Sequence, residues 1–282
     1  MSSRLMEAPP GGFRDELTGL VGVVERNVYL VKRYLWWEVA FLLWTVANSF
    51  TIVLIAKGVE AAGGRLDVNR ETTVLLIGAV VWAYLRVIFE VLTETVQWER
   101  WEGTIEYTFM APLARPVHLL GMGVFAVCFG LIRAAVLFVV MVFAFHLVMP
   151  HANLAAALVL LGVASLSFIG IGMMSAVLPL ISPEKGTQLG FMAQGILLAV
   201  SGVYYTVGVL PRPLQIVARF SPATYALEGI RSAVLDGTGL GHLWGDVWPM
   251  LAIGAASIPL GLWVFRLGEM HAKRHGKLKR SG

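Results

Sequence analysis

Long apolar stretches constrain the fold of this chain more than any other feature of its sequence. We identify six, at residues 38–56, 72–92, 119–149, 154–181, 187–207 and 245–266. Each is long enough to cross about 30 Å of hydrocarbon as a helix that rises 1.5 Å per residue. With 57% hydrophobic residues, 14% charged residues and a mean hydropathy of +0.73, the chain has more apolar surface than a soluble core can bury. The sequence therefore predicts an all-α polytopic membrane protein with six transmembrane helices.

The segment ahead of the first apolar stretch has an amphipathic pattern. Its apolar residues recur at helical spacing: Leu17, Leu20, Val21, Val24, Val28 and Val31. Most charges fall on the other side, and Trp36 and Trp37 follow where aromatic anchors are common. We expect residues 1–37 to form a cytoplasmic N-terminus with a helix in the membrane interface, without a cleaved signal peptide. The alternative is a cytosolic helix that packs on another subunit.

Lysine and arginine residues are distributed unevenly between alternate connecting segments. With six spans and an internal N-terminus, fourteen lie on the inner side, six lie outside, and Arg86 and Arg133 fall within spans. Because basic residues favour the cytoplasmic side, both termini are predicted to be cytoplasmic, in the inner (plasma) membrane. We expect a transmembrane domain at 38–266 and a basic cytoplasmic tail at 267–282. His271 and His275 have no third ligand nearby, so the tail predicts attraction to anionic lipid rather than a metal site.

The residues between the second and third spans predict a short helix on the cytoplasmic face. Gly103 breaks the long helix that leaves the membrane, Thr104 begins a new one at about 104–111, and Pro112 follows it. Exposed aromatic side chains there would be a poor surface unless a partner covers them, or unless they dip into the headgroup region. The candidate residues for partner coupling are Glu102, Gly103, Thr104, Glu106, Tyr107 and Phe109.

The segment before the last span predicts a pair of outer helices that re-enter the membrane, at about 211–237. Proline ends the preceding span, a Ser-Pro pair suits a helix start and Gly237 suits a helix stop. A partly apolar helix at this place is expected at the edge of a pathway, the alternative being a helix on the outer leaflet. The candidate gate residues are Pro211, Pro222, Tyr225, Glu228 and Arg231.

The second and third predicted spans contain three charged residues, namely Arg86, Glu90 and Arg133. A charge at bilayer depth costs at least ~2.5–3.5 kcal/mol, so these side chains are expected to face the interior of the bundle. Structural ion pairing and a role in a substrate path both remain open. Cys128, the single cysteine, is expected to be a buried structural thiol.

Two groups of short motifs resemble the membrane subunits of type-2 ABC exporters, which move drugs, lipids and polysaccharides. The first group comprises Glu102, Gly103-Thr104, Glu106, Pro112 and Leu119-Leu120-Gly121. The second comprises Ser201-Gly202-Val203-Tyr204, Leu210-Pro211, Pro222-Ala223-Thr224-Tyr225 and Arg231. The resemblance covers essentially the whole chain, including the number and order of spans.

The resemblance implies a mechanism and a set of partners. The segment after Gly103 would be a coupling helix in a groove of a separate ATPase subunit, and the first amphipathic helix would be the connecting helix. Two membrane subunits, either two copies of this chain or this chain and a homologous permease, would enclose the path. ATP and Mg would bind the partner subunit. This chain would bind no cofactor, and we expect no nucleic-acid partner.

The chain lacks the sequence needed to hydrolyse ATP. A phosphate-binding loop needs G-x-x-x-x-G-K-[ST], and the Gly276-Lys277 pair lacks both the earlier glycine and the following hydroxyl residue. No catalytic or metal-ligating set stands out on the water-facing loops. We therefore expect a permease rather than an enzyme, for efflux of a hydrophobic small drug or a lipid. The alternatives are a permease for lipid-linked polysaccharide, a membrane-embedded lipid-modifying enzyme and a secondary transporter, although internal repeats typical of the last are not evident.

Overall fold

The described part of the chain is entirely helical. The computed structural model describes residues 12–61, 68–111, 113–182 and 184–275, and no strand occurs in these ranges. The helices are α1 (Phe13–Arg33), α2 (Leu35–Ala61), α3 (Val68–Glu102), α4 (Ile105–Met110), α5 (Arg115–Phe145), α6 (Leu154–Ser175), α7 (Val177–Ile181), α8 (Gly186–Val200), α9 (Arg212–Ala218), α10 (Pro222–Leu235) and α11 (Trp244–Arg274). Two 3-10 turns, η1 (Val207–Val209) and η2 (Leu240–His242), complete them. The predicted all-α class is confirmed.

Five of these helical segments are long and apolar enough to cross a membrane. They are Leu35–Ile55, Arg70–Glu102, Arg115–Phe145, Leu154–Ile181 and Trp244–Arg274. The fifth predicted span, 187–207, differs, because α8 is a 15-residue apolar helix that ends at Val200. Gly202 follows with a positive φ of 69°, which is costly for residues with a side chain. The chain then turns away through η1.

Helix α3 forms the centre of the bundle. Tyr84, Leu85 and Ile88 are fully buried where α3 packs against α5 and α6. Tyr84 also hydrogen-bonds the Ser165 hydroxyl of α6 across 2.5 Å. Since the α3 side chains are enclosed by several neighbours, this helix links the elements at both ends of the molecule.

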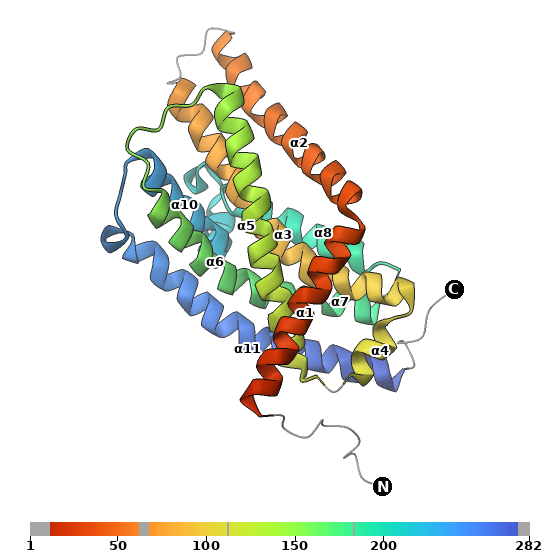
Figure 1. The fold of residues 1–282 in the computed structure, drawn as a ribbon. Helices are drawn as coiled ribbons and strands as arrows, with labels where there is room; N and C mark the ends of the chain where they lie inside the picture. Colours follow the sequence, from red (N-terminus) through yellow and green to blue (C-terminus); the bar gives the residue numbers. More distant parts are fainter. Residues whose placement is uncertain (1–11, 62–67, 112, 183, 276–282) are drawn as a thin grey trace.

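Helices α1 and α2 lie at the edge of the bundle, and α1 crosses α5 (Figure 1). Val23 of α1 is buried in this crossing, whereas Leu17, Val21 and Val28 are exposed. An apolar side that the rest of the chain leaves uncovered is the arrangement expected of an interfacial helix. The expectation of a buried thiol was wrong: Cys128 is exposed because it lies on the outward face of α5.

Candidate functional site

A sharp turn presents α4 at one end of the bundle. Helix α3 ends at Glu102, and Gly103 follows with a φ of 75°, a conformation that favours glycine. The Thr104 amide donates to the Glu99 carbonyl at 2.8 Å, and Ile105 is buried at the start of α4. The helix expected at about 104–111 is therefore present at the expected place. Pro112, which was expected to follow it, lies outside the described residues.

Helix α4 exposes an apolar and acidic surface. Tyr107 is 71% exposed and Met110 is 65% exposed. Glu102 and Glu106 are also exposed beside them. The end of α3 adds two aromatic residues that the sequence analysis did not select, Trp98 and Trp101, which are exposed and pack edge to face with ring centroids 5.4 Å apart. The signal that could have identified Trp98 and Trp101 in the sequence is their spacing of three residues near the end of a long predicted helix.

Phe109 points in another direction from Tyr107. Its side chain is partly buried, and the Arg115 guanidinium lies over its ring at 4.6 Å from the centroid. The Lys273 ammonium of α11 lies 5.8 Å from the same ring. Phe109 thus anchors α4 to its own bundle, while Tyr107 remains available to another protein.

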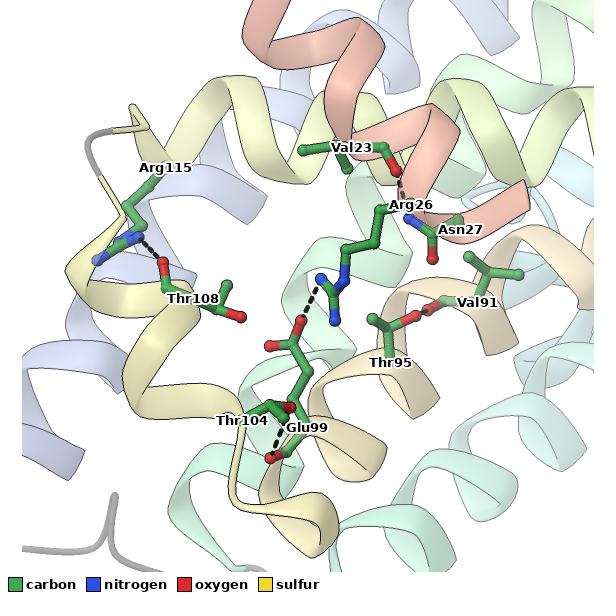
Figure 2. A network of polar contacts seen from close by, with 9 residues as sticks. All are labelled: Val23, Arg26, Asn27, Val91, Thr95, Glu99, Thr104, Thr108 and Arg115. Atoms are coloured by element: carbon green, nitrogen blue, oxygen red, sulfur yellow. Dashed lines mark hydrogen bonds and ion pairs between the residues drawn. The ribbon is translucent and has the colours of Figure 1, made fainter. Parts of the chain in front are cut away.

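Arg115 holds the end of α4 in place. Its guanidinium donates to the Thr108 carbonyl at 3.1 Å, as Figure 2 shows, and to the Phe109 carbonyl at 2.5 Å. The last carbonyls of a helix lack intrahelical donors, so an arginine there acts as a cap. Arg115 also pairs at 3.2 Å with Glu269, which is buried and pairs with Lys273 at 2.7 Å. The cap therefore joins α4 to both α5 and α11.

Two more arginines fasten the end of α3 that carries α4. Arg26 of α1 pairs with Glu99 at 2.6 Å, and this contact lies at the centre of Figure 2. Arg100 donates to the Pro179 and Leu180 carbonyls of α7 at 3.1 and 2.8 Å. Helices α1, α3, α5, α7 and α11 thus all connect to the segment that presents α4.

Helix α10 meets the end of α8 through Arg231. Its guanidinium donates to the Gly202 carbonyl at 3.0 Å and to the Val203 carbonyl at 2.6 Å. The Ser201 and Ser221 hydroxyls are 2.6 Å apart in the same region. The structure therefore brings the first motif of the second group, 201–204, against the last residue of that group, Arg231, with Ser221 close by.

The other gate candidates make fewer contacts with distant parts of the chain than Arg231 does. Pro222 opens α10, as its position after Ser221 suggested. Pro211, which was expected to end the fifth span, instead caps α9, because α8 already ends at Val200. The Tyr225 hydroxyl donates to the Arg219 carbonyl at 2.8 Å. Glu228 is exposed on α10, so within a single chain it is not shielded as a closed gate residue would be.

The charged residues expected within spans take part in two ion pairs on neighbouring helices. Arg86 and Glu90 pair at 3.5 Å along α3. Arg133 of α5 pairs at 3.2 Å with Glu38 of α2, a residue that the sequence analysis had placed only at the start of a span. Both predicted arginines therefore have structural partners, and the pairing of Arg133 with α2 could not be read from spacing along one helix.

Comparison with known proteins identifies the family of this chain. Residues 29–235 match the ABC-2 type transporter family. The match covers well over half of the chain, so the chain belongs to the ABC-2 type transporter membrane family and is a multi-pass membrane permease, a transport component rather than an enzyme. The predicted family resemblance is confirmed.

One relative is the linearmycin resistance permease protein LnrN from Bacillus subtilis (strain 168). It is 29% identical to this chain over 114 residues, which are 40% of this chain and 29% of the relative. The match thus spans less than a third of the relative's length.

Proposed function

We propose that this chain is the permease subunit of an ATP-binding cassette exporter that works as a dimer and is driven by a separate ATPase subunit. The observation that carries the proposal is α4, a short helix that Gly103 turns out of the bundle and Arg115 caps. Its exposed Tyr107 and Met110 suit a partner groove, because buried aromatic anchors contribute most of the energy in protein interfaces. Glu102, Thr104 and Glu106 complete the proposed coupling surface, and ATP and Mg belong to the partner.

The proposed topology has six crossings and two cytoplasmic termini. Five long apolar helices support five crossings, and we assign the sixth to α8, a shorter apolar helix of 15 residues. Helix α1 is the proposed connecting helix within the cytoplasmic segment 1–37, and 267–282 is the proposed cytoplasmic tail. In this arrangement α9 and α10 form a re-entrant pair, and α4 faces the cytosol. Residues 1–11 and 276–282 lie outside the described residues.

The proposed cargo is a hydrophobic small molecule or a lipid. The name of the relative, which gives linearmycin resistance, supports a small-molecule cargo. A lipid-linked polysaccharide is the second candidate cargo, and a membrane-embedded lipid-modifying enzyme is a more distant alternative.

Reconstitution with a candidate ATPase subunit tests the proposal. The tagged permease is co-expressed with an ATPase that contains a phosphate-binding loop, and the purified complex is placed in vesicles. We expect stable co-purification and ATP-dependent, vanadate-sensitive movement of a fluorescent hydrophobic compound. Movement of a lipid-linked oligosaccharide alone would favour the second cargo. Conversion of lipid by the permease without ATP would favour the enzyme and overturn the proposal, as would the absence of any ATPase partner.

A further inference from the structure

Helix α2 has two sides with different surroundings. One side packs on the bundle, where Ser49 and Val53 are buried and Phe50 packs against Phe145 of α5 with ring centroids 5.0 Å apart. The other side faces outward, because α2 lies at the edge of the bundle (Figure 1). The outward side therefore borders whatever surrounds this chain in the membrane.

The outward side of α2 carries one straight stripe of exposed residues along which a second helix can pack. These residues recur at alternating steps of four and three positions, and we call them the α2 seam: Trp37, Phe41, Trp44, Asn48, Thr51 and Ile55. Steps of four and three average 3.5 residues, which is the repeat of two helices that wind around each other. Paired helices in membranes commonly cross at about 20° with this packing.

Asn48 lies near the middle of the bilayer. It is eleven residues after Trp37 and nine residues before Lys57, which is about 16 Å and 14 Å along a helix. Aromatic and basic side chains of this kind favour the two membrane boundaries. Because the hydrocarbon core is about 30 Å thick, Asn48 is close to its centre.

The Asn48 amide is only partly satisfied within its own chain. Its Nδ2 atom donates one hydrogen to the Trp44 carbonyl at 3.0 Å. The second hydrogen of this amide and its Oδ1 atom form no hydrogen bond with any residue that the structure describes. By contrast, Ser165, Ser167 and Ser257, in the middle of α6 and α11, are buried and hydrogen-bonded. An amide that faces hydrocarbon without a partner is costly, so Asn48 requires a polar group from outside this chain.

A second copy of this chain supplies that polar group through symmetry. Two copies inserted in the same orientation are related by a twofold axis along the membrane normal, which places their α2 helices parallel and each seam residue opposite itself. Each Asn48 amide then donates its free hydrogen to the Oδ1 atom of the other. Helix α8 also has an exposed face, but the middle of that face offers no polar side chain, only Met192, Gly195 and Ile196.

We propose that the α2 seam is the interface between two copies of this chain, with a pair of Asn48 amides at its centre. The inference rests on the proposed dimeric export function and names the surface through which the dimer forms. A single asparagine in such a seam fixes the register and the number of paired helices. The exposed rings of Trp37 and Trp44 add aromatic anchors, which contribute most of the energy in protein interfaces.

Disulfide cross-linking in native membranes tests the inference. Single cysteines are introduced in a Cys128→Ser background, which removes the one native thiol. Thr51→Cys and Ile55→Cys lie on the seam, whereas Leu43→Cys and Leu54→Cys are controls on another exposed side of α2. A disulfide needs Cα atoms within about 7 Å of each other. On mild oxidation we expect the seam cysteines to form a covalent dimer about tenfold faster than the controls.

Substitution of Asn48 tests the amide pair separately. Dimer dissociation is measured by Förster transfer between labelled copies as the protein is diluted in lipid vesicles. Asn48→Leu should raise the dissociation constant about tenfold, which corresponds to 1.4 kcal/mol, because it removes both hydrogen bonds of the pair. Thr45→Val is the matched control, since it removes one uncharged polar group from another side of α2, where the hydroxyl bonds the Phe41 carbonyl. It should leave the dissociation constant unchanged.

Equal cross-linking rates at seam and control positions would overturn the inference, as would a disulfide between a seam cysteine and a different protein. Labelling of Thr51→Cys by a water-soluble maleimide without dimer formation would also overturn it, by placing the seam on a water-filled path. An unchanged dissociation constant in Asn48→Leu would overturn the amide pair.

The fate of the proposed export function is determined separately. If ATP-driven transport occurs but the seam cysteines form no dimer, export stands and this interface falls. If the seam cysteines cross-link but no ATPase associates, the interface stands and export falls.

Discussion

Tyr107 and Phe109 belong to the same short helix but face different surroundings. Tyr107 is exposed, whereas Phe109 packs under Arg115. We expect Tyr107→Ala to weaken association with the ATPase about thirtyfold, the effect of losing a ~2 kcal/mol interface anchor. Phe109→Ala should instead lower the free energy of unfolding by roughly 1–2 kcal/mol, because truncation of a half-buried ring costs less stability than truncation of a fully buried ring.

Binding titrations and thermal unfolding in detergent distinguish the two effects. Each variant serves as the control for the other, since both remove one aromatic ring from α4. Equal losses of association in both variants would show that the face assigned to Phe109 also contacts the partner.

His118 is a buried residue without a visible role. It is 3% exposed, and neither ring nitrogen has a hydrogen-bond partner among the described residues. An unsatisfied buried polar group costs about 1–3 kcal/mol, so His118→Leu should stabilise the protein and raise its Tm by roughly 2–4 °C for each kcal/mol gained. The exposed His242→Leu is the matched control and should leave the Tm unchanged. A lower Tm for His118→Leu would reveal a partner or a function for the imidazole.

For single residues, the sequence predicted backbone features such as helix ends better than it predicted which side chains pair with each other. Gly103 and Pro222 act locally, so their effects on helix ends could be predicted from neighbouring residues. Arg26 and Glu99 are 73 positions apart, and nothing in one sequence links them. The same holds for Arg115 and Glu269, which meet only because α5 and α11 converge on α4. Candidate sites built from such long-range pairs require the folded arrangement.

Helix α8 ends earlier than its apolar sequence predicted, and α10 supplies the reason. The apolar run continues to Val207, but its hydropathy does not reveal that Arg231 binds the carbonyls of Gly202 and Val203. Because the Arg231 guanidinium donates to these two carbonyls, they do not need hydrogen bonds from amides of a continuing helix. The hydropathy of the sequence thus predicted where α8 lies. The contact from Arg231 of α10 accounts for where α8 ends.

Replacement of Arg231 should loosen the junction of α8 and α10. Lysine keeps the charge but lacks the planar fork that reaches two carbonyls at once. We expect Arg231→Lys to increase amide hydrogen exchange of residues 201–207 about tenfold, the effect of losing one hydrogen bond worth ~1–1.5 kcal/mol. Arg219→Lys, an exposed arginine beside the same helix pair, should leave this exchange unchanged. Unchanged exchange in Arg231→Lys would show that packing alone holds the junction.

The topology of the whole molecule can be tested with single cysteines. In a Cys128→Ser background, an impermeant thiol reagent on intact cells should label cysteines at Gly58 and Gly241 and should not label those at Gly12 and Glu184. All four positions are exposed, so access depends on the side of the membrane rather than on burial. The uneven lysine and arginine distribution motivates this arrangement. If only the cysteines at positions 12 and 184 were labelled, the predicted topology would be reversed and α4 would lie outside the cell.

Helix α3 is one continuous helix that connects both ends of the molecule. Gly78 lies under the outer junction so closely that a Cβ there would approach the Val203 carbonyl oxygen to 2.1 Å, while the other end of α3 carries Glu99 and the turn to α4. A helix of 35 residues is about 52 Å long. A tilt of about 5° around its midpoint would move each end by roughly 2 Å in opposite directions. There is no free space beside Gly78, so if α4 is the coupling helix we expect such a tilt to shift the Gly202–Val203 backbone and, through Arg231, helix α10.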